Sequence, residues 1–410
     1  MLSSHKQLIV RYFSFSAAKV SLLIGKSAIL VLAYSWLSIA EFAFVASIIS
    51  LIEITRPISD MGAENIVYSR LAAKHRPLPK VIQKILQLRI LSSAFISATG
   101  LAILVVLDGT SFAPLIVLPI IIALQNSNLA FLQKSNFQGK LAILSFSALV
   151  LSVISILIAY LFKTQGLALA FLLISPELFT CLLGVLLTTS QWQTLFTQKT
   201  LYKRGGRQLA FYILPSISIG FIVMIYSRLD ITFVRPMLGL DAQASYSAAF
   251  RLIDPILLLL SLASLSLLTE LGVNNSANAR AISIRLLEKM GLQFYIVYAG
   301  VFLGLAYILH KISIEFLNFS NETAALLAML ALIIPIKLLN IFYSSLLQRA
   351  GKFNLILVAA SITLITTFIL AFVFGMLWHV TGVALAAITA ELINMIYQKI
   401  MVKKTLGIAP

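Results

Sequence analysis

Six basic side chains lie inside long apolar segments of this sequence: Lys19, Lys26, Arg56, Arg228, Arg251 and Lys337. A charged side chain at the centre of a membrane helix costs about 2.5–3.5 kcal/mol on insertion scales. If all six faced lipid, the total would be on the order of 15–20 kcal/mol, which exceeds the stability of a typical protein. Most of them are therefore expected to face a cavity or a charged partner. Buried Lys and Arg side chains together favour the binding of an anion.

Lys19 and Lys26 are seven residues apart, so they share one face of a helix. Lys26 lies deep in its apolar segment and is a candidate substrate-binding residue. Lys19 is a second candidate, although it lies only a turn or two inside, where a lysine can instead snorkel to the interface.

Two further candidates come in acid–base pairs followed by proline. Glu53 and Arg56 precede Pro57, and Arg251 and Asp254 precede Pro255. Each pair is spaced for an intrahelical ion pair, and each proline loosens the helix beside it. Interrupted segments at corresponding places in two halves of a transporter point to a transport site. The alternative is two purely structural ion pairs.

Arg228 and Asp230 are two residues apart and cannot share a helical face well, so each is expected to pair with another helix or to line a cavity. Arg228 is assigned to substrate binding, and Asp230 to coupling or ion pairing together with Glu53 and Asp254. Single charges inside other apolar segments are expected to be structurally paired: Glu177, Glu270, Glu391 and Lys337.

The composition predicts the elements that position these residues. The chain has 410 residues, of which 60% are hydrophobic and 11% charged, whereas soluble domains carry about 25% charged residues. Windows of about 20 apolar residues predict about twelve membrane-spanning helices. Their limits are near 12–34, 39–59, 85–107, 112–133, 141–161, 167–189, 210–234, 243–269, 290–310, 323–346, 353–375 and 383–401. The sequence therefore predicts an all-α polytopic membrane protein.

The net charge of +17 comes from basic residues in alternate loops. One side holds most of them, including Lys74, Lys80, Lys203, Arg207, Lys352 and Lys403, and the other holds only Lys163, Arg235 and Lys311. This bias predicts a bacterial inner-membrane protein with both termini in the cytoplasm, and it argues against nucleic-acid binding. Trp36, Trp192 and Trp378 fall at predicted helix ends, where tryptophan prefers the interface.

A basic loop at 190–209 divides the predicted helices into two sets of six. The expected organisation is an N-terminal lobe (1–198), a basic cytoplasmic linker (199–209) and a C-terminal lobe (210–410). Both sets begin on the cytoplasmic side, so the lobes are expected to form a parallel repeat around a central cavity.

Several kinds of chemistry find no support in the sequence. The one cysteine, Cys181, allows no disulfide within the chain, and the four histidines lack metal-ligand spacing, so no metal or cofactor is expected. There is no Walker A loop and no visible nucleophile with its base. The residues favour a transporter, not an enzyme, with a cationic cavity for an anionic, amphiphilic substrate.

Three stretches resemble the polysaccharide-transport branch of the multidrug/oligosaccharidyl-lipid/polysaccharide exporter superfamily. The first is Tyr226-Ser-Arg-Leu-Asp230 with Gly239 and Tyr246-Ser-Ala-Ala-Phe-Arg251. The second is Gln348-Arg-Ala-Gly-Lys352 with Gly382-Val-Ala-Leu-Ala386, and the third is Arg56-Pro-Ile-Ser-Asp-Met-Gly62. The motifs are short, but they are spread over nearly the whole chain.

The resemblance implies a flippase that moves an undecaprenyl-diphosphate-linked oligosaccharide to the outer leaflet, by alternating access, for O-antigen, other lipopolysaccharide or capsule assembly. It also implies membrane lipids, a polysaccharide polymerase and a chain-length regulator as partners. Two alternatives stay open: a cation-coupled multidrug antiporter of the same fold, which should have an acidic cavity, and an integral-membrane polysaccharide polymerase, which should have a large outer loop.

Overall fold

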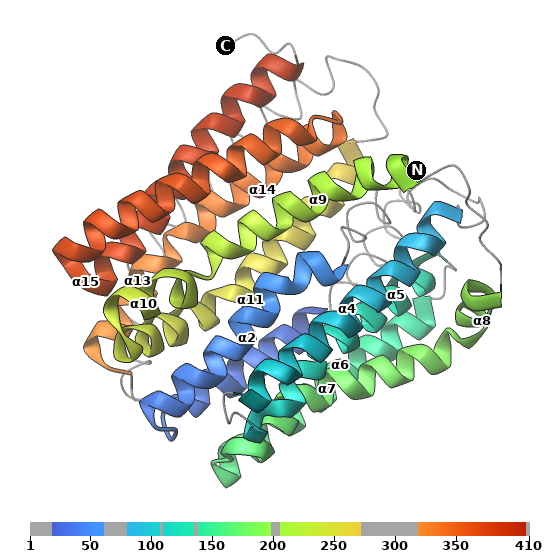
Figure 1. The fold of residues 1–410 in the computed structure, drawn as a ribbon, viewed down its shortest axis with the longest axis horizontal. Coiled ribbons are helices and arrows are strands. Elements are labelled where there is room, and N and C mark those ends of the chain that lie inside the picture. Colours follow the sequence, from blue (N-terminus) through green and yellow to red (C-terminus); the bar gives the residue numbers. More distant parts are fainter. Residues whose placement is uncertain are drawn as a thin grey trace. The chain divides into compact units, whose positions relative to one another are not determined.

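The computed structural model describes residues 19–60, 80–106, 110–134, 138–197, 206–271 and 319–406. Every regular element in these ranges is a helix (Figure 1). Six helices of the described part are long and apolar enough to cross a membrane, and a bent pair makes a seventh if it counts as one span. The prediction of an all-helical polytopic membrane protein is confirmed. The predicted span at 290–310 lies outside the described residues.

The chain forms two compact units. One is built from residues 1–29 and 47–224, and the other from residues 30–46 and 225–410. The tip of the first helical hairpin thus belongs to the second unit. The division into lobes 1–198 and 210–410, and the parallel repeat that relates them, stay predictions.

The first helix of the described chain covers residues 19–33, and its residues up to 29 belong to the first unit. Most of α2 (Ile39–Asp60) belongs to this unit as well. It continues with α4 (Lys80–Val106), the 3₁₀ helix η1 (Thr110–Val117), α5 (Leu118–Lys134), α6 (Gln138–Phe162) and α7 (Gly166–Leu187). Helices α4, α5, α6 and α7 pack as neighbours in this order, with α5 also against α7 (Figure 1). The short α8 (Thr189–Thr197) and most of α9 (Gly206–Ser227) complete the unit.

The second unit contains the end of α9, the π-helix η2 (Asp230–Val234), α10 (Arg235–Leu238) and α11 (Leu240–Leu271). It continues with α13 (Asn321–Ala331), α14 (Ile333–Arg349) and α15 (Phe353–Leu406). Helix α11 packs against α13 and α14, and α14 lies along α15 (Figure 1). Its core joins apolar residues of η2, α11, α13, α14 and α15.

The segment predicted as one span at 210–234 is broken. After Ser227 the helix stops, and the following helices η2 and α10 leave at 62° to α9. Gly239 ends α10 with φ +90°, a conformation that favours glycine, and α11 starts at the next residue. The turn between α10 and α11 therefore explains why the motif that contains Tyr226 and Arg228 has a glycine at position 239.

Element α15 consists of two helices joined by a sharp turn. The two helices correspond to the predicted spans 353–375 and 383–401. Trp378 and His379 leave helical geometry, with His379 at φ +50°. A Cβ at Gly382 would collide with the carbonyl oxygen of Phe374, so the two arms approach more closely than any larger residue allows. The exposed Trp378 lies in this turn, at a helix end as predicted.

Two details of the prediction are wrong. Helices α2 and α11 run through Pro57 and Pro255 without interruption, because a proline near neighbouring packed helices can be accommodated inside a helix. The predicted loop at 190–209 contains α8 and the start of α9. Trp192 lies in α8, shortly after α7 ends; its side chain is buried, and its Nε1 donates to Asn128 Oδ1 at 2.7 Å.

Candidate functional site

Two arginines of the second unit meet at one carboxylate. Arg228 lies at the break between α9 and η2, and its Nη1 is 2.8 Å from Asp254 Oδ2. Nη1 of Arg251, one turn before Asp254 on α11, is 3.5 Å from the same oxygen. All three side chains are buried. The predicted Arg251–Asp254 pair is therefore present, and the partner expected for Arg228 on another helix is Asp254.

The same break positions Asp230. Its Oδ2 accepts a hydrogen bond of 2.7 Å from Ser247 Oγ on α11, so both charged residues of the Arg-Leu-Asp motif contact this helix. The guanidinium of Arg228 also lies over the ring of Phe250, 5.2 Å from its centroid, a cation–π contact. Two guanidinium groups and two carboxylates thus gather where the helix is discontinuous.

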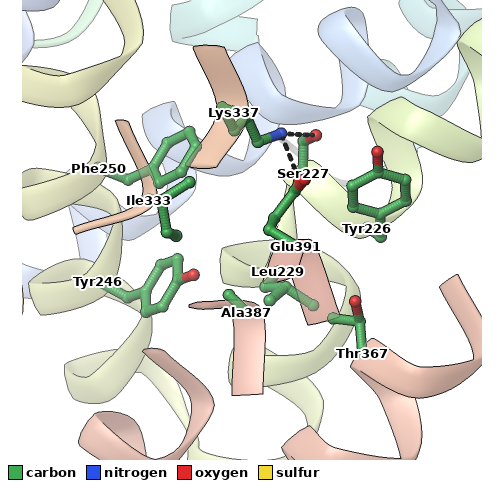
Figure 2. A pocket seen from close by; sticks show the side chains of 10 residues that line it. All are labelled: Tyr226, Ser227, Leu229, Tyr246, Phe250, Ile333, Lys337, Thr367, Ala387 and Glu391. Atoms are coloured by element: carbon green, nitrogen blue, oxygen red, sulfur yellow. Dashed lines mark hydrogen bonds and ion pairs between the residues drawn. The ribbon is translucent and has the colours of Figure 1, made fainter. Parts of the chain in front are cut away.

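A second polar cluster lies between α9, α14 and α15. Lys337 Nζ is 2.8 Å from Glu391 Oε1 and 3.4 Å from Ser227 Oγ (Figure 2). Asn340 Nδ2 donates to Glu391 Oε2 at 2.6 Å, and the lysine ammonium lies 5.4 Å from the centre of the Tyr226 ring. Lys337 and Glu391 were each predicted to be structurally paired, without a named partner, and the structure pairs them with each other.

Tyr226, Ser227, Lys337 and Glu391 line a small cavity of about 20 Å³, which is room for about one water molecule. Figure 2 shows the lysine amino group pointing toward Ser227 and the Glu391 carboxylate, with the rings of Tyr246 and Phe250 on another side of the space. The cavity therefore combines one Lys–Glu ion pair with hydroxyl groups and aromatic rings.

The first unit has its own buried lysine–glutamate pair. Lys26 Nζ is 2.7 Å from Glu177 Oε1 on α7, and both side chains are buried. One residue before Lys26, a Cβ at Gly25 would lie 2.6 Å from the Ser152 side chain, so the helix packs closely on α6. Lys26 was predicted to bind substrate, but its charge is already opposed by a carboxylate.

The sequence analysis missed a further buried arginine. Arg89 on α4 is 2% exposed and forms an ion pair with Asp60, the last residue of α2. Its Nη1 also donates to Ser127 Oγ of α5 at 3.2 Å. Arg89 lies near the start of a long apolar helix, where a basic residue is easily attributed to the interface. A helical wheel would have placed it on the same face as Ser93, one turn later and also buried.

The remaining predicted residues divide between the units. Lys19 is buried in the first helix, and Glu53 and Arg56 are partly buried on α2 in the first unit. Arg228, Asp230, Arg251 and Asp254 come together in the second unit. The side chain of Glu270 lies outside the described residues. No group of three His, Cys, Asp or Glu side chains able to hold a metal is found in the described part of the chain.

Solved structures with the same arrangement of helices are transporters. A transporter of the multidrug/oligosaccharidyl-lipid/polysaccharide (MOP) superfamily from Pyrococcus furiosus superimposes with a TM-score of 0.70 at 12% identity, covering 98% of this chain and 96% of that one. An outward-facing multidrug resistance transporter of the MATE family gives 0.67 at 12% identity, covering 98% and 96%. The Vibrio cholerae MATE transporter VcmN gives 0.63 at 14% identity, covering 99% and 97%.

The chain has the MATE fold. At these identities the likeness describes the architecture alone. No protein-family model matches the sequence, and no curated protein matches it.

Proposed function

We propose that this protein is a membrane transporter that moves an anionic amphiphile across the bilayer by alternating access. The observation that carries the proposal is the broken span in the second unit, where Arg228 and Asp230 lie at the discontinuity and Asp254 contacts both Arg228 and Arg251. Discontinuous helices bearing buried charges are typical of transporter binding sites. The MATE fold of the whole chain supports transport as the general activity.

The substrate class that we propose is an undecaprenyl-diphosphate-linked oligosaccharide, moved from the cytoplasmic to the outer leaflet of a bacterial inner membrane. A guanidinium carries five donors in a planar fork, enough to hold a carboxylate on one edge and a phosphate on another. Arg228 and Arg251 are the proposed diphosphate ligands, with Asp254 orienting both. The lipid tail would remain in the bilayer. A polysaccharide polymerase and a chain-length regulator are the proposed partners.

One structural neighbour, from Pyrococcus furiosus, differs from other transporters of its superfamily in the polarity of its binding pocket. Its structure is described by the words "reverse polarity of binding pocket suggests different function". Within this fold, then, a pocket of altered polarity has already been associated with a changed role. The short motifs around Arg228, Gly239 and Arg251 support the polysaccharide branch in particular.

A cation-coupled multidrug antiporter is the second candidate, because the other similar structures are of MATE transporters, including multidrug resistance proteins. Buried carboxylates are also present: Asp230, Asp254, Glu177 and Glu391. In the described residues, however, Asp254, Glu177 and Glu391 each contact a basic side chain, which lowers their attraction for a cationic drug.

Reconstituted vesicles separate the two candidates. The purified protein would be assayed for translocation of a fluorescent lipid-diphosphate-linked sugar and, in parallel, for efflux of a cationic dye. Translocation of the lipid-linked sugar that Arg228→Ala abolishes supports the flippase. Dye efflux without lipid translocation overturns it in favour of the antiporter.

A further inference from the structure

Each predicted six-helix half ends on a helix with the same short pattern. Helix α7 begins Gly166-Leu-Ala-Leu-Ala and later carries Glu177-Leu, and the second arm of α15 begins Gly382-Val-Ala-Leu-Ala and later carries Glu391-Leu. In each unit this glutamate forms an ion pair with a lysine from another helix, Lys26 in the first and Lys337 in the second. The two pairs are not equivalent in detail, because Glu177 follows its glycine by 11 residues and Glu391 by 9, and Lys26 and Lys337 come from different spans of their halves. What they share is a glutamate on the last helix of each half that is paired with a lysine of another helix.

The pair in the second unit is built asymmetrically. The Lys337 side chain is 15% exposed, whereas that of Glu391 is 5% exposed. Asn340 Nδ2 donates both to the carboxylate and to the backbone carbonyl of Glu391. The ammonium can therefore be approached from outside the unit, while the carboxylate is fixed and reached through the water-sized cavity.

Charge balance couples two ligands at such a pair. A proton alone on Glu391 would leave the partly buried Lys337 ammonium without its counter-ion. An anion alone at Lys337 would leave two negative charges against one positive charge. Proton and anion arriving together keep the site neutral, because the anion replaces the carboxylate as the partner of the ammonium. Binding of each then favours the other, by the same factor in both directions.

We propose that Lys337 and Glu391 form a site that takes up a proton together with an anionic group of the substrate. Glu391 accepts the proton from water, and Lys337 binds the anion. The titratable and charged groups around Glu391 in the described structure are Lys337 on α14, Tyr226 on α9 and Tyr246 on α11. Ser227 and the cavity beside it supply the polar route for the proton. The proposal rests on the proposed function for the anionic class of the substrate.

The test uses the full chain in lipid nanodiscs in weakly buffered solution, with a pH-indicator dye and farnesyl diphosphate as the probe. The wild-type protein is expected to take up protons when it binds the probe. Glu391→Gln should bind the probe and lose the proton uptake that this site contributes. Lys337→Met should bind it about tenfold more weakly, the loss of one charge-assisted hydrogen bond. Glu322→Gln, an exposed acid on α13, is the matched control and should behave as wild type.

The double variant Lys337→Met with Glu391→Gln is the control for misfolding. It removes both charges of the ion pair, so neither charge is left buried without its partner. It should melt close to wild type, bind the probe weakly and take up no protons through this site. Wild-type proton uptake in Glu391→Gln overturns the proposal, as does probe binding by the wild type without proton uptake or no binding at all. A protein that translocates lipid-linked sugar without proton uptake contradicts this inference alone. Proton uptake without translocation contradicts the proposed function alone.

Discussion

Arg228 and Asp254 join the broken span to the unbroken helix beside it through a contact of 2.8 Å between Nη1 and Oδ2. The guanidinium lies where the backbone of α9 has stopped, and the carboxylate lies in the continuous helix α11 just before Pro255. The ion pair thus holds the geometry of the discontinuity as well as neutralising charge. Asp254 is the residue on which both nearby arginines depend.

Replacing Asp254 should therefore damage folding more than transport chemistry. Asp254→Asn leaves Arg228 and Arg251 buried beside a neutral amide, and loss of one partner of a buried pair costs about 3–5 kcal/mol. Membrane yield and the melting temperature in detergent should both fall. Asp241→Asn, in the exposed first turn of the same helix, should leave both unchanged. Normal yield and melting of Asp254→Asn would contradict the orienting role.

The arginines themselves should affect function at normal abundance. Arg228→Ala or Arg251→Ala should weaken surface-polymer display in a complemented deletion strain about tenfold or more, because a charge-assisted hydrogen bond to phosphate is worth about 1.5–3 kcal/mol. Arg→Lys at either position should restore part of it, since the charge survives without the bidentate fork. Exposed Lys352→Ala is the control. If both alanine variants sustain full display, the diphosphate binds elsewhere.

Asn128 on α5 is expected to fix the position of α8 through its hydrogen bond with Trp192. Its amide donates to the Cys181 carbonyl and accepts from Thr188 Oγ1 and Trp192 Nε1, at 3.1, 3.0 and 2.7 Å. Asn128→Ala leaves the buried indole N–H without its acceptor, a loss of about 1–3 kcal/mol. Tryptophan emission should shift to longer wavelength and the melting temperature should drop. Gln193→Ala, exposed on α8, should do neither.

The turn inside α15 should tolerate no side chain at Gly382. Gly382→Ala forces the Phe374 carbonyl and the new methyl apart, so the two arms must separate and the membrane yield should fall severalfold. Gly139→Ala makes the matched comparison, because a Cβ there meets no atom within 4 Å. Equal yields of the two variants would show that the close approach is not needed for folding.

The loop charges predict topology. Reporter fusions after Arg207 and Lys352 should report the cytoplasm, and fusions near Asp108 and Lys311 the outer side. An outer-side signal after Arg207 would contradict the arrangement of twelve spans with both termini inside.

The sequence predicted the helices well for a simple reason. A membrane helix must satisfy its backbone internally and be apolar along its length, so hydropathy alone locates it. The segments at 39–59, 141–161 and 167–189 match α2, α6 and α7 to within a few residues. The break after Ser227 escaped prediction because the residues on both sides of Arg228 and Asp230 are apolar, and no proline or glycine lies at the break itself.

Partners were harder to predict than burial. The intrahelical pair Arg251–Asp254 follows from spacing on one helix, and the structure contains it. The pairs Lys26–Glu177 and Lys337–Glu391 join helices that are far apart in the chain, and nothing local encodes which helices become neighbours. The pair of Arg89 and Asp60 was missed for the same reason, since the two residues lie on different helices, α4 and α2.

Residues 30–46 are synthesised first but complete the second unit. The ring of Tyr34 packs edge-on against Phe42 and Phe319, its hydroxyl lies 3.4 Å from that of Thr323, and Gln243 donates to the Ala43 carbonyl. Phe42 belongs to the same hairpin, but Gln243, Phe319 and Thr323 leave the ribosome only after more than half of the chain has been made. The first hairpin must therefore wait in the membrane without these later partners, and contacts of such long sequence separation form late and slowly. Nascent chains halted before α13 should accordingly be the species that membrane proteases recognise, whichever substrate the finished protein carries.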